Sequence, residues 1–266
     1  MDARTYQIVF VDIDWTILDH NKNDWDYPSL ETLKKAQEEG ILIYLCTARP
    51  FDSVYHTGLL DIFNPDGIIC TNGGVCFIKD KLLFSNIIPE PIVKQVEDIA
   101  NKYNLVLELS TNKDRYFTAE VNDYVRNYFA VYKEVVPDVR KYQNKEVSAI
   151  LLFAPEEYDK ILKNELPKEM NYLRFDSHGV DVGYFQNTKG GAIKKVLKHL
   201  KIDKENSIGI GDSFDDISMF HEVGLSIAMG NGSDDAKSEA DVIAPDIADH
   251  GIKEVFKKMK IVKNTL

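Results

Sequence analysis

Three short apolar runs of this chain each end abruptly in a polar loop. Apolar runs of this length suit strands that are covered on both faces, as the strands of a parallel sheet are. The runs, each with the polar residues that follow it, are Ile8–Val11 with Asp12 and Asp14, Ile41–Cys46 with Thr47, and Ser207–Ile210 with Asp212, Asp215 and Asp216. Because the carboxyl ends of parallel strands lie at one edge of the sheet, we expect these polar side chains to converge.

Helices are expected between these strands. Residues 28–39 carry apolar side chains at helical spacing and stop at Gly40, a residue type that often follows the last turn of a helix. Residues 189–200 and 252–259 also have amphipathic spacing. Strands that alternate with helices imply right-handed crossovers and a parallel sheet. The sequence therefore predicts an α/β core with a doubly wound, Rossmann-like parallel sheet.

The segment 85–185 differs from the rest of the chain, because it lacks the acidic loops found on either side of it. A helix is expected at 92–103, and strands are expected at 105–109, 116–119, 147–153, 172–175 and 181–185. We therefore predict an inserted α+β domain at 85–185 within a core made of residues 1–84 and 186–266. Its aromatic side chains are expected to form the core of that domain: Tyr116, Phe117, Tyr124, Tyr128 and Phe129.

The charge and the cysteines of the chain limit its partners and its compartment. A net charge of −11 argues against nucleic-acid and anionic-membrane partners, which both require a basic surface. The three cysteines, Cys46, Cys70 and Cys76, form no CxxC pair, so buried and reduced thiols are expected. The apolar run that ends at Asp12 is too short and too acidic for a signal peptide or a membrane span. A cytoplasmic protein is therefore expected.

The predicted edge of the sheet brings together the parts of a phosphoryl site. Asp12, Asp14 and Asp212 offer hard oxygen ligands, which suit Mg²⁺ far better than zinc. Thr47 offers a hydroxyl group, and Lys189 adds a cation at the start of a helix, where the helix dipole is also positive. Such a set of groups is typical of phosphoryl transfer. The residues alone leave open which aspartate attacks phosphorus.

Four motifs in this order resemble those of the haloacid dehalogenase superfamily. Asp12-Ile-Asp-Trp-Thr resembles its DxDGT signature, Thr47 and Lys189 match its second and third motifs, and Gly211-Asp-Ser-Phe-Asp-Asp resembles its fourth motif, GDxxND. The insert looks like the α/β cap of the Cof-type sugar-phosphatase branch. Three later landmarks are similar to that branch as well: Thr71-Asn-Gly-Gly, Ile227-Ala-Met-Gly-Asn and Asp249-His-Gly-Ile.

The resemblance implies a Mg²⁺-dependent phosphatase of small phosphorylated metabolites, sugar phosphates above all. It implies that Asp12 attacks phosphorus and that Asp14 protonates the leaving alcohol and then activates water. It further implies a Mg²⁺ ion held by Asp12, the Asp14 backbone carbonyl and Asp212, with Asp216 in the outer shell, and phosphoryl oxygens bound by Thr47 and Lys189. Arg49, Asn72 and Asp215 are expected near the substrate, although an ion pair for Arg49 and a simple turn for Asn72 are equally open.

Two residues depart from the family pattern. Trp15 stands where glycine is preferred, so its indole is expected either to pack against the core or the cap or to face the substrate. Asp215 stands where asparagine is usual, and an acid beside a phosphate repels it unless the acid is protonated, ion-paired or turned away. These departures keep a rival hypothesis open, that of a non-catalytic regulator that binds a phosphometabolite.

Phosphotransfer between sugar positions is a second alternative to the phosphatase. The identity of the substrate and the choice between monomer and dimer also stay open.

Overall fold

The computed structural model describes residues 6–132, 134–143 and 145–263. Contacts within the chain divide it into two compact units. The first unit consists of Met1–Ala48, Phe63–Leu83 and Thr188–Leu266, and the second of Arg49–Ile62 and Phe84–Asn187. The second unit thus includes residues 49–62 in addition to the segment 85–185. The domain limits expected from the sequence, 1–84 with 186–266 and 85–185, stay a prediction.

The first unit is built on a large, mostly parallel sheet. Its strand order is β15 (Val242–Ile243), β14 (Leu225–Ala228), β13 (Ser207–Gly211), β1 (Ile8–Val11), β4 (Leu42–Cys46), β5 (Gly67–Cys70), β6 (Val75–Ile78) and β7 (Lys81–Ser85). The strands from β15 to β5 pair in parallel, and β6 then pairs antiparallel with β5. Every residue of β1 and β13 is buried, as the apolar runs predict for strands covered on both faces.

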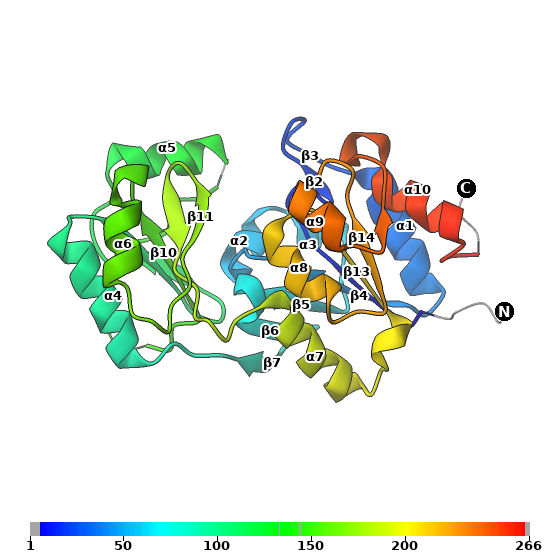
Figure 1. Cartoon of the computed structure of the whole chain (residues 1–266), viewed down its shortest axis with the longest axis horizontal. Coiled ribbons are helices and arrows are strands. Elements are labelled where there is room, and N and C mark those ends of the chain that lie inside the picture. The colour runs from blue at the N-terminus through cyan, green and yellow to red at the C-terminus, as the bar shows by residue number, and fades with distance from the viewer. Residues whose placement is uncertain (1–5, 133, 144, 264–266) are drawn as a thin grey trace. The chain divides into compact units, whose positions relative to one another are not determined.

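Helices cover this sheet. They are α1 (Tyr27–Glu38), α7 (Lys189–Leu200), α8 (Ile217–Phe220), α9 (Asp234–Glu239) and α10 (Gly251–Met259). Helix α1 packs against α10 and β4, while α8 packs against α7, β13 and β14, and Figure 1 shows β4 and β13 between the two groups. The predicted fold class, an α/β protein with a Rossmann-like parallel sheet, is confirmed. In the described part of the chain, no helix is both long enough and apolar enough to cross a membrane.

The strand register brings the three predicted polar loops to one place. Val11 of β1 lies level with Ile210 of β13 and with Leu45 of β4. The chain therefore leaves three neighbouring strands at the same height, and Asp12, Thr47 and Asp212 follow at the same edge of the sheet. The strand order reverses at β1, since the chain continues from β1 to β4 on one side and returns later as β13 on the other. Ligands of open α/β sheets bind at such a switch point.

A small hairpin follows β1, and the sequence did not predict it. Its strands are β2 (Leu18–Asp19) and β3 (Asp24–Trp25), in which Leu18 pairs with Trp25. The Asp19 carboxylate accepts backbone hydrogen bonds from Asn21 at 2.9 Å and from Lys22 at 3.3 Å. These bonds close the connecting turn around His20. Strands of two residues are too short to produce an alternating pattern, so the sequence gives little sign of them.

The second unit contains an antiparallel sheet with helices on both of its faces. The strand order is β11 (Leu173–Asp176), β12 (Gly179–Asp181), β10 (Ala149–Phe153), β8 (Val106–Ser110) and β9 (Arg115–Phe117). The described helices of this unit are α2 (Phe51–His56), α3 (Leu59–Ile62), α4 (Glu90–Lys102), α5 (Asp123–Val131) and α6 (Asp159–Glu165). Helices α4 and α6 share one apolar cluster with one face of the sheet, and α5 shares another cluster with Val106, Phe117 and Phe153.

The aromatic residues expected in the core of the second unit belong to these clusters, with Tyr124 and Tyr128 at the edge of the α5 cluster. Strand β12 begins earlier than the predicted strand at 181–185. The reason is a tight turn after β11, in which the Asp176 carboxylate accepts a hydrogen bond from the His178 N–H at 2.6 Å.

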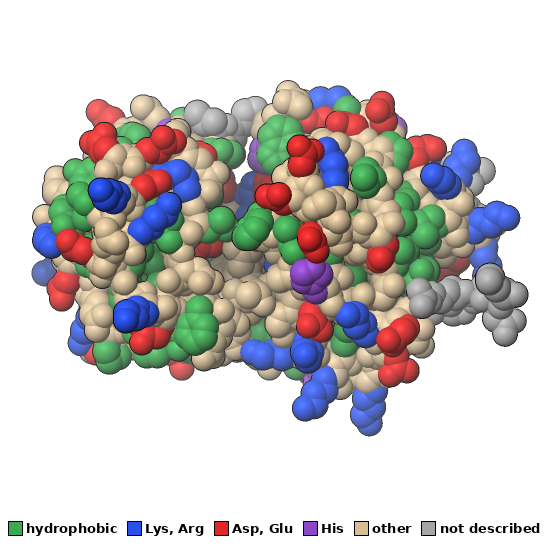
Figure 2. Space-filling model, in the orientation of Figure 1, with side chains coloured by type: hydrophobic (Ala, Val, Ile, Leu, Met, Phe, Trp, Pro, Cys, Tyr) green, Lys and Arg blue, Asp and Glu red, His purple; other side chains and the backbone are tan. Residues whose placement is uncertain are grey.

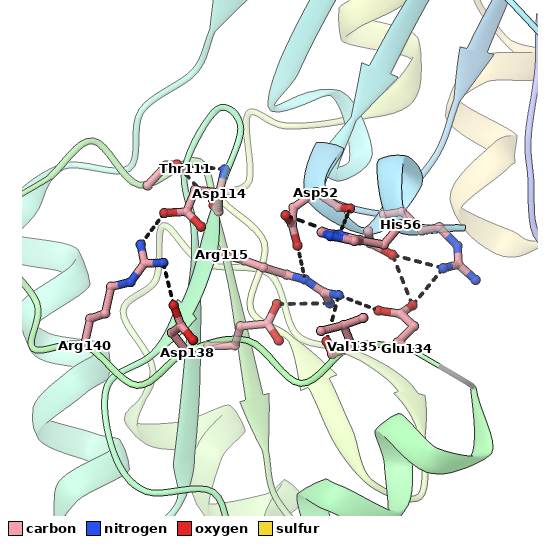
Figure 3. Close-up of polar contacts among 12 residues, drawn as sticks. Asp52, His56, Thr111, Asp114, Arg115, Glu134, Val135, Asp138 and Arg140 are labelled. Atoms are coloured by element: carbon pink, nitrogen blue, oxygen red, sulfur yellow. Dashed lines mark hydrogen bonds and ion pairs between the residues drawn. The ribbon is translucent and has the colours of Figure 1, made fainter. Parts of the chain in front are cut away.

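A buried network of ion pairs lies around Arg115 of β9 (Figure 3). The Arg115 guanidinium donates to Asp52 of α2 at 3.0 Å, and it lies 2.8 Å from Glu134, which follows α5. Glu108 of β8 is fully buried, and its nearest cation is Arg115 at 3.9 Å. Neither carboxylate oxygen of Glu108 accepts a hydrogen bond from a described residue. Burial, opposed by Arg115, therefore raises the pKa of Glu108 from 4.5 to about 7.

This raised pKa predicts a pH-dependent stability. Between pH 4.5 and 7 folded Glu108 holds a proton that the unfolded chain has released, so stability falls as the pH rises. Glu108→Gln removes this effect and should stabilise the protein by up to about 3 kcal/mol above pH 7, with little change near pH 4.5. Urea unfolding at pH 5 and pH 8 measures the difference, with Glu120→Gln as an exposed control. An equal effect of Glu108→Gln at both pH values would contradict the prediction.

Candidate active site

The buried side chain of Lys189 is the centre of the candidate active site. Lys189 is the first residue of α7 and is 1% exposed, whereas the lysines on the outer face of the same helix are in contact with solvent (Figure 2). Its ammonium group lies 2.7 Å from Asp12, 2.6 Å from Asp216 and 3.1 Å from Asp215. One cation thus joins the ends of β1 and β13 to the start of α7, as the convergence of the loops predicts.

Close approach of the backbone makes this arrangement possible. A Cβ atom on Gly190 would lie 2.0 Å from the Ser218 carbonyl oxygen, so only glycine lets α7 start this close to α8. A Cβ atom on Gly211 would lie 2.2 Å from the Asp216 carboxyl carbon. The absence of a side chain at Gly190 and at Gly211 therefore allows Lys189 and Asp216 to take up these positions.

Asp216 is engaged at both of its carboxylate oxygens. One oxygen accepts from Lys189, and the other accepts from the backbone N–H groups of Asp212 at 2.9 Å and Ser213 at 3.0 Å. These bonds fix the backbone of the loop that presents Asp212. Asp216 is fully buried, and its carboxylate stabilises the conformation of this loop from inside.

The cluster contains more negative than positive charge. Oxygen atoms of Asp12, Asp212 and Asp216 lie within 4.8 Å of one another, and Lys189 is the cation that contacts Asp12 and Asp216. Burial raises the pKa of Asp12 well above its ordinary range, against the attraction of Lys189. Burial and the neighbouring Asp216 likewise raise the pKa of Asp212 to about 8, although Thr16 donates a hydrogen bond to it at 3.2 Å. The excess of hard oxygen donors over cations fits a divalent metal ion such as Mg²⁺.

Asp215 is accommodated by an ion pair. Its carboxylate contacts Lys189 and accepts a hydrogen bond from the Ser213 hydroxyl. Burial alone would raise its pKa, but Lys189 and Ser213 together hold the pKa of Asp215 below its usual value. Of the three ways in which an acid can be tolerated at this position, the structure therefore shows the ion-paired one.

Trp15 explains why glycine is preferred at its position. Its φ is +59°, in the left-handed region that costs a residue with a Cβ atom about 1 kcal/mol. Its N–H donates to the Leu18 carbonyl at 2.9 Å, and its carbonyl accepts from the Asn231 side chain at 2.8 Å. The indole is 38% exposed and lies against the His20 imidazole, with 5.0 Å between the ring centroids. The hairpin that packs against the indole was not among the expected partners of Trp15.

The other predicted residues lie at different places. Asp14 is partly exposed, and its carboxylate contacts His20 at 2.7 Å. Thr47 is buried at the end of β4, and its carbonyl accepts from the Asn72 N–H at 3.1 Å, within a turn where Asn72 has a φ of +52°. Arg49 forms an ion pair with Glu134 at 2.7 Å inside the second unit. Substrate contacts for Arg49, Asn72 and Asp215 stay a prediction.

The sequence assigned no chemical role to three residues that contact the site. They are Thr16, which donates to Asp212, His20, which forms a hydrogen bond with Asp14, and Asn231, which donates to the Trp15 carbonyl. Thr16 follows the acidic motif directly and could have been inferred from it. His20 depends on the unpredicted hairpin, and Asn231 lies 216 residues from its partner.

Known proteins resemble this chain over nearly its whole length. The family model described as haloacid dehalogenase-like hydrolase matches residues 9–256. The phosphoglycolate phosphatase of Methanobrevibacter smithii is 27% identical over 94% of this chain and 97% of its own length. The 5-amino-6-(5-phospho-D-ribitylamino)uracil phosphatase YitU of Bacillus subtilis is 23% identical over 97% of this chain and 98% of its own. The solved structure of the HAD subclass IIB sugar phosphatase BT4131 aligns with a TM-score of 0.85 and 26% identity, over 96% of this chain and 100% of that one.

Removal of the central cation should destabilise the fold. Lys189→Met leaves buried carboxylates without their counter-ion and should lower the free energy of unfolding by about 3 to 5 kcal/mol at pH 8 in the presence of a chelator. The loss should shrink toward pH 4, where the carboxylates take up protons. Lys194→Met, on the exposed face of the same helix, is the matched control. If both variants unfolded at the same urea concentration as the wild type, Lys189 would not be the organising cation.

Proposed function

Since the chain belongs to the haloacid dehalogenase-like hydrolase family, we propose that it is a Mg²⁺-dependent phosphatase of small phosphorylated metabolites, sugar phosphates in particular. Its relatives are named as phosphatases, and the chain is accordingly a phosphoric monoester hydrolase. The observation that most supports the detailed proposal is the contact of 2.7 Å between the Lys189 ammonium and Asp12 at the carboxyl end of β1.

Asp12 is the proposed nucleophile. It is 5% exposed and is held by Lys189, so its attacking oxygen has a fixed position in a site from which water is largely excluded. A bond forms between a carboxylate oxygen of Asp12 and phosphorus as the bond from phosphorus to the leaving oxygen breaks. The product is an aspartyl phosphate and the free alcohol.

Asp14 is the proposed proton carrier. Its side chain is 31% exposed and does not belong to the buried carboxylate group around Lys189, so it can reach a leaving group that enters from solvent. It gives its proton to the leaving alcohol, and it then takes a proton from the water that cleaves the aspartyl phosphate. Lys189 and Thr47 are proposed to bind the phosphoryl oxygens, because an ammonium group and a hydroxyl group both donate hydrogen bonds.

Asp12, Asp212 and the Asp14 backbone carbonyl are the proposed Mg²⁺ ligands. Mg²⁺ supplies positive charge for the phosphoryl group when it is bound. Asp216 is proposed to act from the outer shell, since hydrogen bonds already occupy both of its oxygens. A bound cation would oppose the burial and the neighbouring carboxylates, which together keep the pKa of Asp12 high.

The substrate class rests on the relatives and on the predicted cap at 85–185. The relatives are named for different phosphorylated compounds, and the structural neighbour is named as a sugar phosphatase. Phosphoryl-transfer groups alone do not choose a leaving group, so the choice falls to residues outside the carboxylate cluster. The ion pair with Lys189 accommodates Asp215, one of the two departures from the family pattern, which favours the hydrolase over the regulator.

A phosphate-release screen of phosphorylated metabolites, with and without Mg²⁺, tests the proposal. The wild type should release inorganic phosphate only with Mg²⁺, and Asp12→Asn should lower turnover at least about 1,000-fold while the protein stays folded. Asp203→Asn is the control, since Asp203 is exposed and its side chain makes no capping hydrogen bond. Full activity of Asp12→Asn would refute the mechanism. Transfer of phosphate to a second sugar hydroxyl without release would favour the phosphotransfer alternative.

The raised pKa of Asp212 predicts how Mg²⁺ binding depends on pH. Asp212 must be ionised to bind the ion, and its pKa in the metal-free protein is about 8, so Mg²⁺ affinity should rise as the pH increases from 6 to 9. Mg²⁺ should therefore raise the Tm more at pH 9 than at pH 6, and Asp212→Asn should abolish this difference. A Tm shift that is the same at both pH values would contradict the assignment of Asp212.

A further inference from the structure

A histidine that the family motifs do not include lies against the proposed proton carrier. The His20 Nε2 atom is 2.7 Å from the Asp14 Oδ1 atom, a distance typical of a strong hydrogen bond. The two side chains are only 16% and 31% exposed, His20 being the more buried of the two. The contact joins the end of β1 to the turn of the β2–β3 hairpin.

The turn that carries His20 and the residue beside its ring are both held by further bonds. Its turn is closed by Asp19, which is 4% exposed and accepts two backbone hydrogen bonds from the turn. Its ring lies against the Trp15 indole. The backbone carbonyl of Trp15 accepts from the Asn231 side chain, which in turn accepts from the Ile247 N–H at 2.9 Å. The imidazole is therefore carried by a closed turn and lies against the indole of a residue whose backbone is held at both its N–H and its carbonyl.

The position of Asp14 differs from that of the other carboxylates of the site. Asp12, Asp215 and Asp216 are oriented by the buried ammonium group of Lys189. The Asp14 carboxylate lies at a more exposed place, where a side chain has more freedom to turn. A misplacement of about 1 Å can cost 100-fold in rate, so a group that transfers a proton gains much from a fixed partner.

We propose that His20 is a positioning residue, which holds the Asp14 carboxyl group in the orientation that delivers its proton to the leaving oxygen, and that Trp15 braces the His20 ring. This inference rests on the proposed phosphatase function. In the step concerned, the bond from Asp12 to phosphorus forms and the bond from phosphorus to the leaving oxygen breaks. The proton of Asp14 passes to that oxygen, and Asp14 is left as the carboxylate. Trp15, which stands at the glycine position of the motif, is thus proposed to support His20.

Substrates with different leaving groups distinguish a positioning role from a general structural role, which would lower kcat/KM for all of them alike. An alkoxide is a poor leaving group and needs the proton of Asp14, whereas p-nitrophenolate leaves readily without it. His20→Ala should lower kcat/KM about 10- to 100-fold for a sugar phosphate of the panel that the wild type hydrolyses, such as glucose 6-phosphate. For p-nitrophenyl phosphate the loss should stay below about 3-fold. The parameter kcat/KM is used because it reports the steps up to departure of the leaving group.

Further variants separate positioning from folding. His20→Gln keeps a donor that can reach Asp14 and should recover much of the activity on the sugar phosphate. In an Asp14→Asn background, His20→Ala should cause no additional loss, because the group that it positions is already gone. Trp15→Gly removes the brace and relieves the positive φ, and it should reduce sugar-phosphate activity selectively. His221→Ala is the matched control, since His221 is exposed and pairs with Glu239 away from the site.

Three outcomes would overturn the inference, and they separate its failure from that of the proposed function. Equal losses for the sugar phosphate and p-nitrophenyl phosphate, or an undiminished loss in the Asp14→Asn background, would refute the positioning role while the phosphatase function stands. Absence of phosphate release by the wild type from both probes would instead remove the proposed function itself, and the inference with it.

Discussion

The buried ammonium group of Lys189 is the interaction on which the first unit depends. It lies within 3.1 Å of three carboxylates from two strand ends, and it comes from the first residue of a helix that must approach α8 closely. Breaking a buried ion pair on one side costs several kcal/mol, so β1, β13 and α7 are bound to a single geometry. That geometry also leaves the cluster short of positive charge, which is the physical basis for a divalent cation in the proposed reaction.

The two units treat buried charge differently. Around Lys189 the carboxylate oxygens of Asp216 are all engaged, and the backbone N–H groups of the loop are used to hold them. In the second unit Glu108 is fully buried without a hydrogen bond from the described residues, and Arg115 is occupied mainly by Asp52 and Glu134. The first arrangement places several carboxyl oxygens beside one cation at the edge of a sheet, whereas the second keeps a neutral acid inside at low pH. Only the first is built like a catalytic centre.

The sequence alone was sufficient for the parallel core and for the group around Lys189. Fully apolar strands and the polar residues directly after them depend on local pattern, and a parallel sheet then brings their ends together whatever their separation in sequence. The hairpin around His20, the early start of β12 and the backbone of Trp15 depend on single hydrogen bonds between side chain and backbone, which leave no periodic pattern. The sequence left three ways in which Asp215 can be tolerated, namely protonated, ion-paired or turned away, because its ion pair depends on the approach of α7 to the loop.

We infer that Lys189 holds Asp12, rather than another carboxylate of the cluster, ready to attack phosphorus. The most direct measurement is chemical trapping during turnover: acid quench, reduction of any acyl phosphate to homoserine with borohydride, and peptide mass spectrometry. Homoserine is expected at position 12 and at no other carboxylate. Homoserine at position 14, 212, 215 or 216, or steady phosphate release from an enzyme that never acquires a trappable acyl phosphate, would contradict it.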